Sequence, residues 1–128
     1  MPAMDIRPLE GVGAEITGVD LKALSRAEET AIRDAFAEQG VIFFRDQSLS
    51  EEDHIAFAQR FGQINVNRFF AAHPDYPQIA MVAKDVGDTD NIGGGWHTDH
   101  SYDEIPALGS VLVARELPKT GGDTRFAS

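Results

Sequence analysis

Residues 25–44 read SRAEETAIRDAFAEQGVIFF, and this stretch decides how the first half of the chain folds. The hydroxyl of Ser25 can cap a helix, and Glu28 follows at the three-residue spacing of a capping box. Apolar residues recur at the spacing of one helix face: Leu24, Ala27, Ala31, Ile32, Ala35 and Phe36. Gly40 is typical of a residue that ends a helix, and residues 41–44 form an uninterrupted apolar run. The stretch therefore predicts an amphipathic helix followed by a buried strand.

A second helix is predicted to begin after Ser50. Residues 51–53 are all acidic, and the positive end of the helix dipole favours anions in the first turn. The expected apolar face of this helix consists of Ile55, Ala58 and Phe61. Gly62 is expected to end it.

Shorter signals elsewhere predict strands. Residues 6–9 and 13–16 have the composition of two short strands separated by glycine. Residues 79–83 and 108–114 are further expected strands, and residues 124–127 have the pattern of a strand that is only begun. Helices and strands together indicate a mixed α+β fold. Because the sequence ends within a strand pattern, we expect the chain to be the front part of a longer protein.

The composition excludes several classes of partner. The 128 residues carry 21 acidic and 11 basic side chains, a formal net charge of −10. Such a charge repels phosphate groups, so neither nucleic acid nor an anionic membrane is expected as a partner. The absence of cysteine excludes disulfides and thiolate chemistry. No apolar run is long enough to span a bilayer and no secretory signal is evident, so we expect a cytoplasmic protein.

The densest group of chemically active side chains is WHTDH, residues 96–100. Side chains alternate along an extended strand, so His97 and Asp99 would point to the same side, with Thr98 and His100 opposite. An imidazole and a carboxylate at this spacing are two of the three ligands of a two-His-one-carboxylate Fe(II) site, which leaves positions open for co-substrate and O₂. The simpler interpretation is a hydrogen-bonded His–Asp pair.

Several motifs occur together and in order in this chain. They are Gly13-Ala14-Glu15-Ile16, Gly18-Val19-Asp20-Leu21, GVIFFRDQ at 40–47, FAQRFG at 57–62, WHTD at 96–99, Pro106-Ala107, Glu116-Leu117-Pro118 and GGDT at 121–124. In this order they resemble the N-terminal half of the TauD/TfdA (taurine dioxygenase-like) family of Fe(II)/2-oxoglutarate dioxygenases. The resemblance implies a double-stranded β-helix, or jelly roll, with flanking helices, of which residues 1–128 would form a partial domain.

The resemblance also implies roles for individual residues. His97 and Asp99 match the family's first two iron ligands, and Thr124 matches a threonine that hydrogen-bonds the distal carboxylate of 2-oxoglutarate. The family's second histidine ligand and an arginine for the co-substrate come later than residue 128. Fe(II), 2-oxoglutarate and O₂ are therefore the implied cofactor and co-substrates, and the 128-residue chain alone is expected to be inactive.

The implied substrate is a small molecule. Taurine-oxidising members hold their substrate with a histidine, a tyrosine and an asparagine, and the matching positions here are Asn67, Phe70 and Gly93. These three departures argue against taurine. The resemblance leaves a small organic acid, such as a sulfonate or an aryloxy acid, as the expected substrate of a hydroxylation.

Two other interpretations stay open. One is a small cupin-type metal protein, although such barrels usually carry more histidines within one motif. The other is a truncated, non-catalytic metal-binding or oligomerisation module, since the family often forms homo-oligomers. A complete cupin site would bind Fe(II) tightly, whereas a chain with two of three ligands would bind it weakly.

Overall fold

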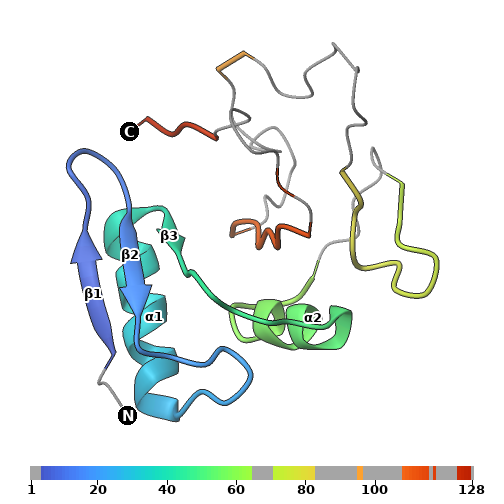
Figure 1. The fold of residues 1–128 in the computed structure, drawn as a ribbon, viewed down its shortest axis with the longest axis horizontal. Coiled ribbons are helices and arrows are strands. Elements are labelled where there is room, and N and C mark those ends of the chain that lie inside the picture. Colours follow the sequence, from blue (N-terminus) through green and yellow to red (C-terminus); the bar gives the residue numbers. More distant parts are fainter. Residues whose placement is uncertain are drawn as a thin grey trace.

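The computed structural model describes residues 4–64, 71–82, 95–96, 108–115, 117 and 124–127. Its helices and strands follow one another as β1 (Asp5–Pro8), β2 (Ala14–Thr17), α1 (Arg26–Gln39), β3 (Ile42–Phe43) and α2 (Glu51–Gln59), as Figure 1 shows. This is the predicted mixture of helix and sheet. Among the described residues, no helix combines the length and apolar character that crossing a membrane requires.

The three strands form one sheet in the order β1-β2-β3. β1 and β2 are antiparallel, with Ile6 opposite Ile16. β2 and β3 are parallel, with Ala14 opposite Ile42, and α1 provides the crossover that a parallel pair requires (Figure 1). The two strands predicted at 6–9 and 13–16 are therefore confirmed within one residue. The jelly roll stays a prediction, because the described strands form only this small sheet.

α1 begins and ends where the sequence predicts. The backbone N–H of Glu28 donates to the Ser25 hydroxyl at 3.1 Å, and the Ser25 N–H donates to the Glu28 carboxylate at 2.9 Å. Gly40 follows the helix with φ 77°, and its N–H donates to the carbonyl of Phe36. Ile32 and Ala35 are buried, but Ala27 is exposed because the buried face of the helix starts beyond the first turn.

The core lies between α1, β2 and α2. Its buried members are Ile16, Leu21, Ile32, Ala35, Leu49 and Phe57. The Phe57 ring makes edge-to-face contacts with Phe44 and Phe61, at centroid distances of 5.9 and 5.4 Å. Phe36 of α1 meets Phe61 in the same way at 5.8 Å. These aromatic contacts connect α2 to the first helix and to the chain after β3.

Three details of the predicted helix and strand are wrong. In α2 the buried residue is Phe57, whereas the predicted face of Ile55, Ala58 and Phe61 is half-buried. The helix also ends at Gln59, before the expected stop at Gly62. The expected buried strand at 41–44 is only two residues long and half-buried, because β3 is paired on one side alone within the described residues.

The later predicted strands are not found in the described residues. Ala80 makes a single bridge with Ala72, and residues 108–114 and 124–127 are irregular. The two-residue alternation is nevertheless present, since Val111 and Val113 pack against the core while Leu112 is 79% exposed. The apolar pattern therefore indicates which side chains face inward, but a strand also needs a neighbouring backbone with which to pair.

Candidate functional site

Most of the predicted site residues lie outside the described part of the chain. These are His97, Asp99, Asn67, Phe70 and Gly93. Thr124 is described, and its side chain is exposed in the irregular segment 124–127. The proposed iron ligands and substrate contacts therefore stay predictions. The structure does show how the described segments 71–82 and 108–115 are attached to α2.

No group of three or more His, Asp or Glu side chains within the described ranges could hold a metal ion. His54 is half-buried, and its Nε2 lies 2.8 Å from the carbonyl oxygen of Val111. A carbonyl oxygen can only accept, so Nε2 carries the proton of this bond. His73 has a local role too, because its Nδ1 accepts from the backbone N–H of Asp75 at 3.1 Å.

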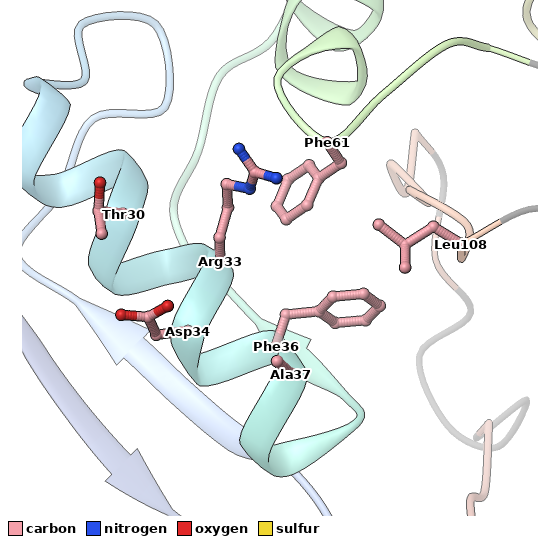
Figure 2. A pocket seen from close by; sticks show the side chains of 7 residues that line it. All are labelled: Thr30, Arg33, Asp34, Phe36, Ala37, Phe61 and Leu108. Atoms are coloured by element: carbon pink, nitrogen blue, oxygen red, sulfur yellow. The ribbon is translucent and has the colours of Figure 1, made fainter.

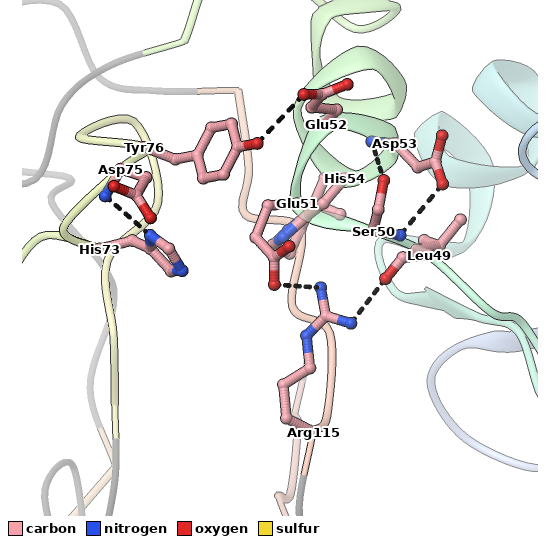
Figure 3. Close-up of polar contacts among 11 residues, drawn as sticks. Leu49, Ser50, Glu51, Glu52, Asp53, His54, His73, Asp75, Tyr76 and Arg115 are labelled. Carbon is pink, nitrogen blue, oxygen red and sulfur yellow. Dashed lines mark hydrogen bonds and ion pairs between the residues drawn. The ribbon is translucent and has the colours of Figure 1, made fainter.

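Arg115 fastens the segment 108–115 to the start of α2 (Figure 3). Its Nη1 donates to the carbonyl oxygen of Leu49 at 2.6 Å, and its Nη2 lies 3.6 Å from a carboxylate oxygen of Glu51. The ion pair is half-exposed and contributes ~0–1 kcal/mol. A hydrogen bond from a charged donor contributes ~1.5–3 kcal/mol, so the bond to Leu49 is the dominant contact. Arg115 therefore joins the segment 108–115 to α2 mainly through the Leu49 carbonyl.

We call the contacts of Leu49, Glu51 and His54 with Val111 and Arg115 the α2 clasp. Sequence analysis missed the α2 clasp because 66 residues separate Leu49 from Arg115. Both main acceptors are backbone carbonyls, which leave no trace in the choice of side chain at Leu49 or Val111. An isolated arginine after an apolar run is the only signal, and it is too common to identify the contact.

The start of α2 is fixed by a second capping box. The Asp53 N–H donates to the Ser50 hydroxyl at 3.1 Å, and the Ser50 N–H donates to the Asp53 carboxylate at 3.0 Å. The pKa of Asp53 lies below its ordinary value, first because of this backbone hydrogen bond and second because of the Ser50 side chain. The carboxylate form therefore stabilises the helix end that carries the α2 clasp.

The segment 71–82 is attached to the same helix by Tyr76. Its hydroxyl donates to a carboxylate oxygen of Glu52 at 3.1 Å (Figure 3). This hydrogen bond, and then the negative charge of Glu52, raise the pKa of Tyr76 above 10.0. Two segments far apart in the sequence, 71–82 and 108–115, thus meet on α2.

A pocket of about 390 Å³ lies elsewhere, between α1 and Leu108 (Figure 2). Its lining residues are Thr30, Arg33, Asp34, Phe36, Ala37, Phe61 and Leu108. Phe36, Phe61 and Leu108 point toward one another across it. Thr124, the one predicted site residue within the described ranges, is not among the residues that line this pocket.

The family model for "Taurine catabolism dioxygenase TauD, TfdA family" matches residues 5–128. The match spans both the described fold and the stretch that contains the WHTD and GGDT motifs. The chain belongs to the TauD, TfdA family.

Named relatives agree with this assignment. The chain is 36% identical over 130 residues to the (S)-phenoxypropionate/alpha-ketoglutarate-dioxygenase of Sphingobium herbicidovorans, covering 98% of the chain and 45% of that relative. It is 30% identical to the alpha-ketoglutarate-dependent sulfonate dioxygenase of Saccharomyces cerevisiae, covering 91% of the chain and 31% of that relative. The chain therefore spans less than half the length of these relatives.

A solved structure supports the same fold. A taurine dioxygenase from Burkholderia xenovorans superposes with a TM-score of 0.53 at 37% identity, covering 59% of this chain and 28% of that one. The mixed helix-and-sheet fold of the N-terminal part is therefore similar to the fold of a solved structure from this family.

The family implies Fe(II), 2-oxoglutarate and O₂ as cofactor and co-substrates. The candidate side chains in this chain are of the chemical types that bind Fe(II) and 2-oxoglutarate. His97 and Asp99 would offer the nitrogen and oxygen ligands that suit non-haem iron, and the exposed hydroxyl of Thr124 can donate to a carboxylate.

Proposed function

We propose that this chain forms the N-terminal part of an Fe(II)/2-oxoglutarate-dependent dioxygenase that hydroxylates a small organic acid. The observation that carries the proposal is the continuous family match over residues 5–128, which includes both motifs with predicted site residues. Relatives whose names specify phenoxypropionate and sulfonate as substrates support an organic anion.

In this proposal His97 and Asp99 hold the iron and Thr124 orients 2-oxoglutarate. The bound iron supplies the oxidising chemistry: one oxygen atom of O₂ enters the substrate C–H bond, the other enters succinate, and CO₂ leaves. His97 must be neutral and Asp99 ionised to donate their lone pairs to the iron. The Thr124 hydroxyl donates to the distal carboxylate and fixes the orientation of the co-substrate.

The substrate class follows from the same positions. Asn67, Phe70 and Gly93 stand where taurine-oxidising members carry their substrate residues, and none keeps the family's side chain. A sulfonate or an aryloxy acid with an apolar portion fits Phe70 better than taurine does. Since the net charge of −10 repels anions at long range, a cation close to the site must attract the acid.

The experiment is a panel assay on the protein as its own cell makes it. Succinate formation is followed with Fe(II), 2-oxoglutarate, O₂ and a series of sulfonates, aryloxy acids and taurine. The proposal expects substrate-dependent succinate with a member of the first two classes and little with taurine. Activity with taurine alone would refute the substrate assignment. For the isolated 128-residue chain we expect little or no O₂ consumption, and measurable 2-oxoglutarate-dependent turnover would contradict this.

A second candidate is a non-catalytic metal-binding or oligomerisation module. The observation that favours it is the exposure of large apolar side chains late in the chain, namely Leu108, Leu112, Leu117 and Phe126. Such side chains are typical of surfaces that another polypeptide covers. Weak Fe(II) binding together with a concentration-dependent oligomer, and no succinate with any substrate, would favour this candidate over the enzyme.

A further inference from the structure

We propose that Arg115 and His54 are positioning residues of this dioxygenase. Through the α2 clasp they hold the segment 111–115 on α2, and so fix the chain that connects the predicted iron ligands to Thr124. The inference rests on the proposed function and adds residues that touch neither iron nor co-substrate.

The two main bonds of the α2 clasp run in opposite directions. The Arg115 side chain reaches from the segment to the backbone of α2, at the carbonyl of Leu49, over 2.6 Å. The His54 side chain reaches from α2 to the backbone of the segment, at the carbonyl of Val111, over 2.8 Å. A shift of the segment by one residue would break both bonds at once. The pair therefore fixes the register of the segment as well as its proximity. Figure 3 shows the contacts of Arg115 with Leu49 and Glu51.

The anchor of the α2 clasp on the α2 side includes a residue of the hydrophobic core. Leu49 is only 8% exposed and belongs to the core, and Ser50 caps the helix immediately after it. On the segment, Val111 and Val113 pack against the same core. Polar and apolar contacts thus hold one short stretch from Leu49 to His54 against another from Val111 to Arg115.

The place of this stretch in the sequence gives the α2 clasp its functional meaning. Val111 follows Asp99 and Arg115 precedes Thr124, so the fixed segment lies between the two predicted parts of the site. Ligands and co-substrate contacts must be held to about 0.5 Å to be productive. Because Arg115 is already bound to Leu49 and Glu51, its role is to position the chain, which distinguishes it from a cation that binds the substrate acid.

The test uses the full-length protein with Arg115→Met and His54→Leu, each of which removes one main bond. Arg115→Lys and His54→Gln are the rescue variants, since each keeps an N–H donor. Glu51→Gln is the matched control, because the ion pair is half-exposed and contributes little. Two quantities are measured for each variant: hydrogen exchange of the amides in 111–115, and the KM for 2-oxoglutarate separately from kcat.

Arg115→Met and His54→Leu are expected to speed exchange in 111–115 roughly tenfold or more, the factor that corresponds to one such hydrogen bond. They are also expected to raise the KM for 2-oxoglutarate, while the rescue variants and Glu51→Gln stay close to the wild type. Unchanged exchange would overturn the α2 clasp, and faster exchange with an unchanged KM would overturn its positioning role. Absence of Fe(II)-dependent turnover in the wild type would instead refute the proposed function, so the two failures are distinguishable.

Discussion

Gly13 lies directly against Val41, at the point where β2 begins beside the chain that leaves α1. A Cβ atom added at Gly13 would lie 3.2 Å from the Val41 carbonyl oxygen, and the same oxygen accepts the N–H of Ala14 at 2.9 Å. Gly13 also has φ +103°, a conformation that side chains disfavour. The contact therefore explains why a glycine stands at this place in the first of the family motifs.

Replacing Gly13 by alanine should destabilise the fold by ~1–3 kcal/mol, because backbone strain and a close contact with a fixed carbonyl add up. Gly11→Ala is the matched control: its φ is +93°, but nothing lies within 4 Å of the added Cβ. Gly11→Ala should therefore lose stability through backbone strain alone, without the close contact. Denaturant unfolding of both variants measures the difference. Equal losses would show that the Val41 carbonyl moves aside at no cost.

Acid should weaken the start of α2 through Asp53. Its folded-state pKa lies below the ordinary value of 3.8, because the Ser50 backbone N–H and then the Ser50 side chain favour the carboxylate. The unfolded chain therefore binds this proton first on acidification, so the stabilisation is present above pH 3.8 and is lost as the pH falls through the lower, folded pKa. Unfolding free energies of the wild type and Asp53→Asn are compared across this range. Their difference should disappear in acid, and a difference that stays constant with pH would contradict the assignment.

Tyr76 should titrate above its ordinary value, and the cause is Glu52. The chain has two tyrosines, and ultraviolet absorbance follows the ionisation of both. Glu52→Gln removes the negative charge beside the hydroxyl and should lower the pKa of Tyr76 toward 10.0. Tyr76→Phe identifies the transition by removing it. In the native protein the bond to Glu52 is present below pH 10.0 and is lost as the pH rises through the raised pKa. If Glu52→Gln leaves the transition of Tyr76 in place, the contact is refuted.

The elements that local chemistry specifies could be predicted from the sequence. Both capping boxes, at Ser25 and Ser50, satisfy the first backbone N–H groups of their helices with residues three positions apart. Gly40 ends α1 by local backbone geometry in the same way. Such signals lie within one helical turn and need no tertiary information. The predicted helix starts therefore agree with those in the structure.

The parts of the fold and of the candidate site that the sequence does not predict depend on contacts between residues far apart in the chain. Residues 108–114 alternate as a strand should, but pairing requires a neighbouring backbone that no local pattern specifies. The α2 clasp joins Arg115 to a carbonyl of Leu49, and a backbone acceptor is the same for every residue type. At the candidate site, the His97-x-Asp99 spacing indicates metal ligands, but only the family match raises this above a hydrogen-bonded pair.

We propose that His97 and Asp99 hold Fe(II) for a 2-oxoglutarate-dependent oxidation. The direct measurement is anaerobic Fe(II) binding by the full-length protein in the presence of 2-oxoglutarate, for the wild type, His97→Ala, Asp99→Ala and His100→Ala. Loss of a direct ligand should weaken binding by more than about 100-fold, since outer-shell partners alone contribute roughly 10–100-fold. His100→Ala is the matched control, because in an extended strand its side chain faces away from Asp99. We expect His97→Ala and Asp99→Ala to lose Fe(II) while His100→Ala keeps it. Wild-type affinity for Fe(II) in His97→Ala or Asp99→Ala would contradict the proposal that these two residues are iron ligands.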